Sequence, residues 1–420
     1  MDKLSQFGVS IGEHAGPTFA LYFPLLAAKV DAGEFQEPTE HRYGPSERHV
    51  YDLYLPPSPS DTSSSTTSSQ VGKKEQGKTG KAPTIVFIHG GGMVQGDKQI
   101  EQSRGGAHRN IGTFFAERGY MVEPCKRENG RLGVEQPTAQ RREQQKEHER
   151  VEEESKAANE AGARVVDYEL KRTSRGRHRI IPNYRLRIPD TSNPLYATPA
   201  NASFPSGGID IALLLRHLSA PACHVSHLVD PESLTLVGNS AGAVHAATYL
   251  YRDAIPGFED ALAPLATDPT LTPSNKELTP SGAMFIGMPA HFRAATPDRN
   301  AVLFGYHCPE LFDQPAGAAE EEKEKRMKGL VEERCPVGLR KGSGDGTRVG
   351  TMLAELDPET EIAGPSREFT KTYEQVTGKQ AQELFIAGHN HISVPLGLGL
   401  GGKEEAWGGQ LVQWIEEGRK

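Results

Sequence analysis

The sequence has few cysteines and no concentration of positive charge. Four cysteines occur in 420 residues, without any CxxC pair: Cys125, Cys223, Cys308 and Cys335. Cysteines this sparse and far apart exclude a disulfide-stapled scaffold and favour reduced thiols in a cytoplasmic setting. The formal net charge of -8 gives no electrostatic footprint for nucleic acid, so we expect no nucleic-acid partner.

The sequence also lacks a long apolar run. Its most apolar early stretch, PTFALYFPLLAAKV (17–30), is short and is interrupted by Pro17 and Pro24. A membrane helix needs about 20 predominantly apolar residues, and a signal peptide begins with a basic region rather than mixed charges. We therefore expect neither a signal peptide nor a membrane span, and we assign residues 1–44 to an N-terminal segment that is a candidate cap element.

Apolar runs alternate with helical compositions through the rest of the chain. Strand-like runs occupy 84–92, 233–238, 283–289, 350–358 and 383–391, and helical patterns occupy 204–219, 241–250 and 406–417. Strands that alternate with helices predict an α/β fold with a mostly parallel, doubly wound sheet and helices on both faces. We expect one large domain, at 45–420, with an edge strand or hairpin within 41–56.

Three segments of this domain do not fit a packed sheet. Residues 58–81 are rich in Ser, Thr and Lys, so we expect a disordered, low-complexity loop. Residues 123–179 are dominated by charge, and joining Val122 directly to Ile180 restores one strand-like run, GYMVIIPNYRL. We interpret 123–179 as an exposed, partly helical insertion or as the translation of a retained intron, with a genuine regulatory insertion as the alternative. Residues 290–345 are apolar at first and then charged, and we expect them to form a small cap or insert region between two strands.

Two nucleotide-binding patterns occur in the wrong context. The segment from Gly72 to Thr79 matches a P-loop, but a Ser/Thr tract precedes it and a strand follows, so no helix N-terminus is available to hold phosphate. Gly397, Gly399 and Gly402 spell GxGxxG, yet too little chain follows them to complete a βαβ unit. We therefore expect no nucleotide cofactor.

The stretch LTLVGNSAGAVHAATYL (234–250) places a serine between two glycines where a strand-like run meets a helical one. Gly238 and Gly242 flank Ser240 in the pattern GxSxG, and so sharp a turn has room only for tiny side chains. The turn would hold the Ser240 hydroxyl at the carboxyl end of the sheet and aim the Ala241 N–H at the atom that the hydroxyl attacks. The pattern predicts a nucleophile elbow, and an ordinary glycine-rich turn is the alternative.

Further polar or glycine motifs follow other strand-like runs. HGGG (89–92) ends an upstream run, where bare glycine N–H groups can meet a developing oxyanion. Downstream, Asp357 ends one run, and His389 and His391 end the last. Serine, acid and histidine at three strand ends, in this chain order, match the triad order of α/β-hydrolases.

Together these motifs resemble the α/β-hydrolase superfamily, over roughly residues 45–417 apart from the inserts. The likeness is greatest to hormone-sensitive-lipase-like esterases (α/β-hydrolase fold-3), whose relatives include kynurenine formamidases and isoprenylcysteine methylesterases. The resemblance implies an α/β-hydrolase fold, a Ser240 nucleophile and Asp357 as the orienting acid. It also implies an oxyanion hole formed by three backbone N–H groups, those of Gly91, Gly92 and Ala241.

The resemblance favours His391 as the base, with His389 as the alternative. The family usually places its histidine just before a small or hydrophobic residue that opens the last helix, and Ile392 follows His391. Glu355 and Glu359 are further candidates for the acid, although Asp357 stands better at the strand end. A metal site at the HNH triplet lacks a third ligand at a sensible spacing, and no cofactor is implied.

The implied function is hydrolysis of a small or medium acyl ester through an acyl-serine intermediate. The alternatives are an arylformamidase-type amide hydrolase and a non-catalytic hydrolase-fold protein that only binds a ligand. Asn239, Ala243 and Met93 depart from residues that relatives often carry, which leaves the subfamily and the pocket width open. The natural substrate and the oligomeric state are also left open.

Overall fold

The computed structural model describes residues 3–56, 82–93, 100–120, 202–221, 223, 225–267, 277–314 and 319–419. The expected loop at 58–81, the charged insertion at 123–179 and the strand-like run at 180–186 lie outside these residues. Our hypotheses about these segments therefore stay predictions.

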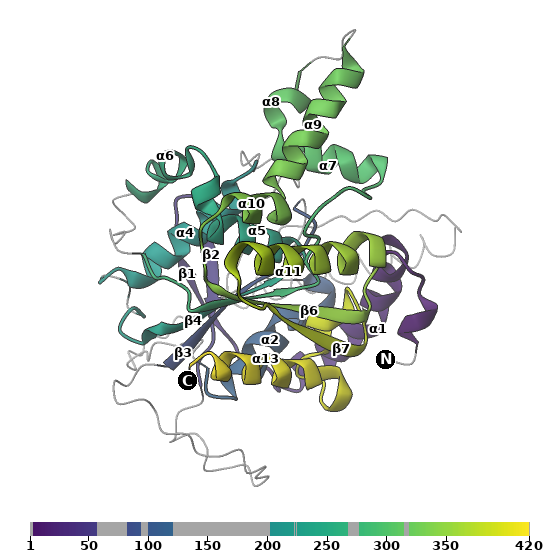
Figure 1. Ribbon diagram of the computed structural model, residues 1–420. Coiled ribbons are helices and arrows are strands. Elements are labelled where there is room, and N and C mark those ends of the chain that lie inside the picture. Colours follow the sequence, from purple (N-terminus) through teal and green to yellow (C-terminus); the bar gives the residue numbers. More distant parts are fainter. Residues whose placement is uncertain are drawn as a thin grey trace, which may run out of the picture. The chain divides into compact units, whose positions relative to one another are not determined.

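A five-stranded parallel sheet forms the centre of the described fold (Figure 1). Its spatial order follows the chain: β3 (Ala82–Ile88), β4 (Val229–Asn239), β5 (Gly282–Ile286), β6 (Arg348–Leu356) and β7 (Gln382–Asn390). Every neighbouring pair is parallel, so all five carboxyl ends meet at one edge of the sheet. The mostly parallel sheet predicted from the apolar runs is confirmed.

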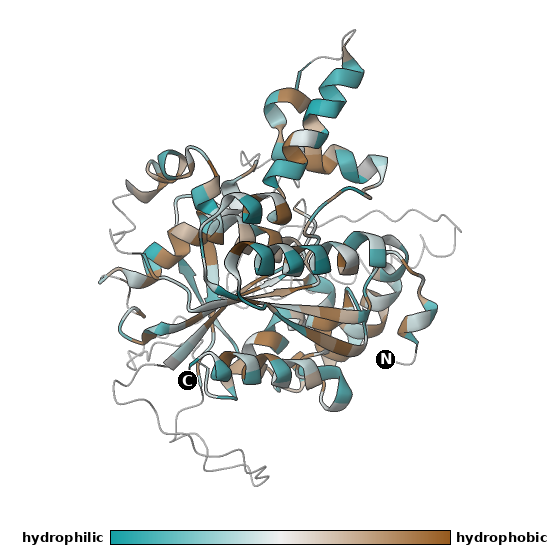
Figure 2. Ribbon diagram, in the orientation of Figure 1, coloured by the Kyte–Doolittle hydropathy of each residue, from teal (hydrophilic) through white to brown (hydrophobic). Residues whose placement is uncertain are grey.

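Helices cover both faces of this sheet, as expected, because alternate strand residues point to opposite sides. Val86 and Ile88 belong to one core, with α4 (Ser206–Ser219), α5 (Ala241–Leu250) and α11 (Gly364–Thr377). Ile85 and Phe87 belong to the other core, with α2 (Gly106–Ala116) and α13 (Ala406–Glu417). Figure 1 shows α11 and α13 on opposite sides of the sheet, and Figure 2 shows apolar residues along its strands. Burial on both faces explains why these strands are continuous apolar runs.

A separate antiparallel hairpin precedes the large sheet. Its strands are β1 (Thr39–Arg42) and β2 (Val50–Leu53), so the expected edge strand or hairpin is a hairpin. The buried hydrogen bond between His49 Nε2 and Asp210 Oδ1, at 3.0 Å, attaches the hairpin to α4.

The N-terminal segment forms a long helix, α1 (Ile11–Asp31), which contains the apolar stretch 17–30. Ser10 and Glu13 begin the helix with a capping box. Helix α1 packs against α2, α12 (Ser393–Gly397) and the short helix η2 (Glu101–Ser103). In the described part of the chain no helix is long and apolar enough to span a membrane.

The insert region at 290–345 is helical where it is described. It contains α7 (Pro297–His307), α8 (Pro309–Phe312), α9 (Glu320–Arg334) and α10 (Pro336–Gly342). Helix α9 is highly charged and mostly hydrophilic along its length (Figure 2), and buries only Met327 and Val331. The remaining short helices are η1 (Leu4–Gln6), η4 (Arg252–Ala254), α6 (Phe258–Leu262), η5 (Leu265–Thr267), η6 (Glu359–Ala363) and η7 (Gly402–Glu405).

Candidate active site

Ser240 stands at the junction of β4 and α5 in a strained backbone conformation. Its φ of 52° and ψ of -119° lie in a region that residues with a side chain rarely adopt. Its N–H donates to the carbonyl of Ile286 on the neighbouring strand at 2.8 Å, which fixes the turn against the sheet. The predicted strand, tight turn and helix are all present, and they hold the Ser240 side chain at the carboxyl edge.

The two glycines of the elbow are required because a side chain at either position would clash with backbone atoms. A Cβ at Gly238 would lie 2.4 Å from Cα of Ala243, and a Cβ at Gly242 would lie 2.1 Å from the carbonyl oxygen of Ile88. Both neighbours are backbone atoms, which cannot rotate away as a side chain can. Strand β3, strand β4 and helix α5 therefore approach one another closely only because these positions lack a side chain.

Ser240, His391 and Asp357 form a continuous hydrogen-bonded chain. Ser240 Oγ lies 2.9 Å from His391 Nε2, and His391 Nδ1 lies 2.9 Å from Asp357 Oδ1. The second carboxylate oxygen, Oδ2, accepts the Ala354 N–H at 2.7 Å. Because a carboxylate only accepts, the Nδ1–H tautomer satisfies Asp357 and leaves Nε2 free to accept from the serine hydroxyl.

The parallel sheet brings these three side chains together. Ser240 follows β4, Asp357 follows β6 and His391 follows β7, all at the same edge. The imidazole and the carboxylate are 4% and 1% exposed, so the pair is shielded from bulk water.

Gly287, directly after β5, gives His391 the room it needs, and the sequence analysis missed it. Its φ is +55°, and a Cβ there would lie 2.9 Å from His391 Nδ1. The sequence signal was a glycine within the apolar run 283–289.

His389 has different partners from His391. Its Nδ1 lies 2.9 Å from Ser393 Oγ, and its Nε2 lies 4.0 Å from Glu404 Oε2. The Tyr22 hydroxyl of α1 donates to the same Glu404 carboxylate at 2.5 Å. Burial lowers the pKa of His389, which favours the neutral ring. Of the two candidate bases, the structure joins His391 to Ser240.

The other candidate acids are engaged elsewhere. Glu355 Oε2 accepts the Gly388 N–H at 2.7 Å, and Glu359 binds Arg367 at 2.8 and 2.9 Å. Asp357 is the carboxylate that contacts the His391 ring.

The glycine-rich run after β3 passes beside Ser240. A Cβ at Gly90 would lie 3.1 Å from the Ser240 Cβ, and Gly91 and Gly92 have φ values of 133° and 63°. The Arg299 guanidinium donates to the Gly92 carbonyl at 2.9 Å, which anchors the end of the run. Arg299 is a second residue that the sequence analysis missed, because it lies on α7 in the insert region.

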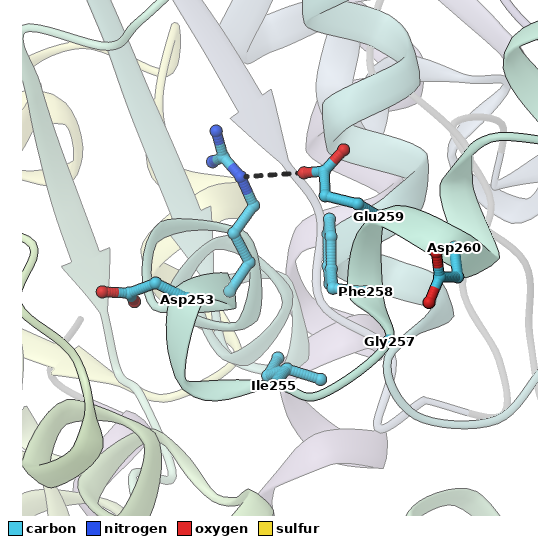
Figure 3. A pocket seen from close by; sticks show the side chains of 7 residues that line it. Asp253, Ile255, Gly257, Phe258, Glu259 and Asp260 are labelled. Carbon is cyan, nitrogen blue, oxygen red and sulfur yellow. Dashed lines mark ion pairs between the residues drawn. The ribbon is translucent and has the colours of Figure 1, made fainter.

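A cavity of about 390 Å³ opens after α5, within residues 252–260 (Figure 3). Its Arg252 lies 3.8 Å from Glu259 and 3.0 Å from Glu277, and its Asp253 accepts the Gly344 N–H at 2.9 Å. These charged groups hold the protein's own elements together, and none of the candidate site residues lines the cavity. Among the described residues no group of three or more His, Cys, Asp or Glu side chains could hold a metal ion.

Solved structures of esterases resemble this chain. Esterase B from Lactobacillus rhamnosis, inhibited by a tributyrin phosphonate, has a TM-score of 0.52 at 14% identity and covers 96% of this chain and 95% of its own. A butyrate-bound esterase from Thermogutta terrifontis has a TM-score of 0.46 at 14% identity and covers 90% and 94%. A carboxylesterase from Lactobacillus plantarum has a TM-score of 0.47 at 12% identity and covers 91% and 98%.

No protein-family model and no curated protein matches the sequence. At these identities the likeness to Esterase B bears on the fold, and it agrees with the central parallel sheet. The chain has an α/β-hydrolase fold.

Proposed function

We propose that this chain is a serine hydrolase that cleaves carboxylic esters of small or medium acyl groups through an acyl-serine intermediate. The observation that carries the proposal is the hydrogen-bonded chain from Ser240 through His391 to Asp357, with 2.9 Å at each step. The finer assignment to hormone-sensitive-lipase-like esterases rests on the sequence resemblance alone.

In the first half of the reaction, Ser240 Oγ attacks the ester carbonyl carbon while His391 Nε2 takes its proton. Asp357 holds the ring in the Nδ1–H tautomer and stabilises the imidazolium that forms. The carbonyl oxygen becomes an oxyanion, to which the N–H groups of Gly91, Gly92 and Ala241 donate. The tetrahedral intermediate then expels the alcohol, which takes the proton from His391 and leaves the acyl group on Ser240.

In the second half, water repeats the same steps. His391 takes a proton from the water as its oxygen attacks the acyl carbon, and returns that proton to Ser240 Oγ as the acid leaves. Each preorganised oxyanion donor contributes on the order of 10²- to 10³-fold to the rate. The Arg299 contact with the Gly92 carbonyl supports this step, because it fixes the end of the glycine run before substrate arrives.

The test uses p-nitrophenyl butyrate, a panel of alkyl esters of graded acyl length, and Ser240→Ala. We expect wild type to release nitrophenolate and Ser240→Ala to lose at least about 10³-fold in kcat/KM, because the nucleophile is absent. A fluorinated alkyl phosphonate should add its mass to wild type at Ser240. Ser219→Ala is the matched control, because the Ser219 hydroxyl donates to the Arg216 carbonyl of its own helix rather than to a candidate site residue.

Activity of Ser240→Ala within tenfold of wild type would overturn the serine mechanism. A wild-type protein that is folded and labelled by the phosphonate, but cleaves only aryl formamides, would replace the ester by an amide substrate. A folded protein that neither reacts nor is labelled would overturn the esterase proposal and favour the alternative of a ligand-binding protein.

A further inference from the structure

His14 on α1 is buried without a hydrogen-bond partner. Its side chain is 1% exposed, and neither Nδ1 nor Nε2 has a partner among the described residues. A buried polar group left unpaired costs about 1–3 kcal/mol, so proteins seldom keep one that has no use. The ring therefore has one donor and one acceptor available for a ligand.

The contacts of α1 place His14 opposite the candidate acid and base. Ile11, His14 and Thr18 are spaced i, i+3 and i+7, so they share one face of the helix. Ile11 packs on a cluster formed by residues on either side of Asp357 in the chain: Leu353, Ile362 and Ala363. Thr18 Oγ1 accepts from Asn390 Nδ2 at 2.8 Å, and Asn390 directly precedes His391.

Electrostatics agrees with this placement. Burial lowers the pKa of His14 most, the interaction with His391 lowers it further, and the Asp357 carboxylate opposes both effects. His14 therefore lies within electrostatic range of both site residues, and burial favours its neutral ring. A neutral imidazole both donates and accepts, as a hydroxyl group does.

The order of the strands indicates which part of a bound ester would lie beside His14. Ser240 follows β4, the glycine run follows the adjacent β3, and His391 with α1 lies at the β6–β7 side. The carbonyl oxygen of a substrate would point to the glycine run. The departing alcohol would lie at His391, which must protonate it, and therefore beside α1.

We infer that His14 contacts the substrate and binds a hydroxyl group on the alcohol portion of the ester, so that the site selects esters of polyhydric alcohols. This inference rests on the proposed esterase function. The alcohol hydroxyl would satisfy the His14 ring, because a hydroxyl group and a neutral imidazole can each donate and accept a hydrogen bond.

The test compares two esters with the same acyl group, 2-hydroxyethyl butyrate and propyl butyrate, which differ by a hydroxyl in place of a methyl group. We expect His14→Leu to lower the ratio of their kcat/KM values about tenfold, which corresponds to the loss of one hydrogen bond. The kcat/KM of His14→Leu for propyl butyrate should stay within about threefold of the wild-type kcat/KM, because leucine fills the space without a polar group. His14→Gln, which can donate and accept, should restore part of the preference.

Tyr22→Phe is the matched control on the same helix, because its hydroxyl binds Glu404 rather than the site. It should leave the ratio unchanged. An unchanged ratio in His14→Leu, or an equal loss for both esters, would overturn the inference and leave the esterase proposal standing. If His14→Leu does not fold, His14→Met takes its place, because methionine also removes the ring's donor and acceptor, and an unchanged ratio in His14→Met would overturn the inference. A wild type that hydrolyses neither ester and resists the phosphonate would remove the esterase proposal together with the inference.

Discussion

Replacing Gly242 by alanine would put a methyl group where backbone atoms already lie. The new Cβ would be 2.1 Å from the carbonyl oxygen of Ile88 and 2.5 Å from that of His89. Since ordinary contact begins at 3.4 Å, α5 and the end of β3 must separate by roughly 1.3 Å at the closer atom. Neither carbonyl can turn away, because both belong to the backbone where β3 ends and the chain enters the glycine run.

We expect this separation to cost stability and activity together. Overpacking of this kind typically costs about 1–3 kcal/mol. A displacement of about 1 Å between the elbow and the glycine run would lower kcat/KM by roughly 100-fold, because catalytic groups tolerate little misplacement. Urea unfolding followed by circular dichroism measures the first quantity, and p-nitrophenyl butyrate hydrolysis by the folded protein measures the second.

Gly409→Ala is the matched control for Gly242→Ala. Gly409 also lies in a helix, α13, but a Cβ there meets nothing within 4 Å. Alanine should stabilise it by about 0.5–1 kcal/mol, since glycine is a poor helix former. If Gly242→Ala unfolds within about 0.5 kcal/mol of wild type and keeps its activity, the steric account of the elbow is wrong.

Two further predictions concern histidines. His391→Ala should lose as much kcat/KM as Ser240→Ala, because the two side chains act as one unit. His389→Ala should lower the urea midpoint but keep activity per folded molecule within about tenfold, because His389 binds Ser393. The opposite ranking would move the base to His389. Burial lowers the pKa of His307 to about 3, so between pH 6.5 and about 3 the unfolded chain binds a proton that the folded chain does not. The free energy of unfolding therefore decreases as the pH is lowered, by up to about 1.4 kcal/mol per pH unit. In His307→Phe the free energy of unfolding should decrease less steeply over the same pH range, and parallel curves for variant and wild type would refute this.

The parts of the fold that depend on local sequence could be predicted. The helices at 241–250 and 406–417 have the expected bounds, because composition and flanking residues determine them. The elbow could be recognised because its steric demand falls on glycines two residues from Ser240. Because the strands are parallel, the meeting of their carboxyl ends at one edge could be predicted without knowing any side-chain contact.

The choice between neighbouring residues could not be predicted from local pattern. His389 and His391 follow the same apolar run, and only distant partners distinguish them: Glu404 for the former and Asp357 for the latter. The preference for His391 came from the family resemblance. The position of His14 near the site could not be predicted for the same reason, since the hydrogen bond that places its helix joins Thr18 to a residue 372 positions away.

The docking of α1 has a consequence for synthesis on the ribosome. Helix α1 is made before the sheet, but two residues that hold it, Asn390 and Glu404, are made 372 and 382 residues after their partners Thr18 and Tyr22. At about 5–20 residues per second, the 372 residues from Thr18 to Asn390 take roughly 20–75 s. During that time the stacked pair Phe19 and Phe23 lacks the surface against which it packs in the folded chain, so the nascent chain exposes two aromatic rings that folding partly buries.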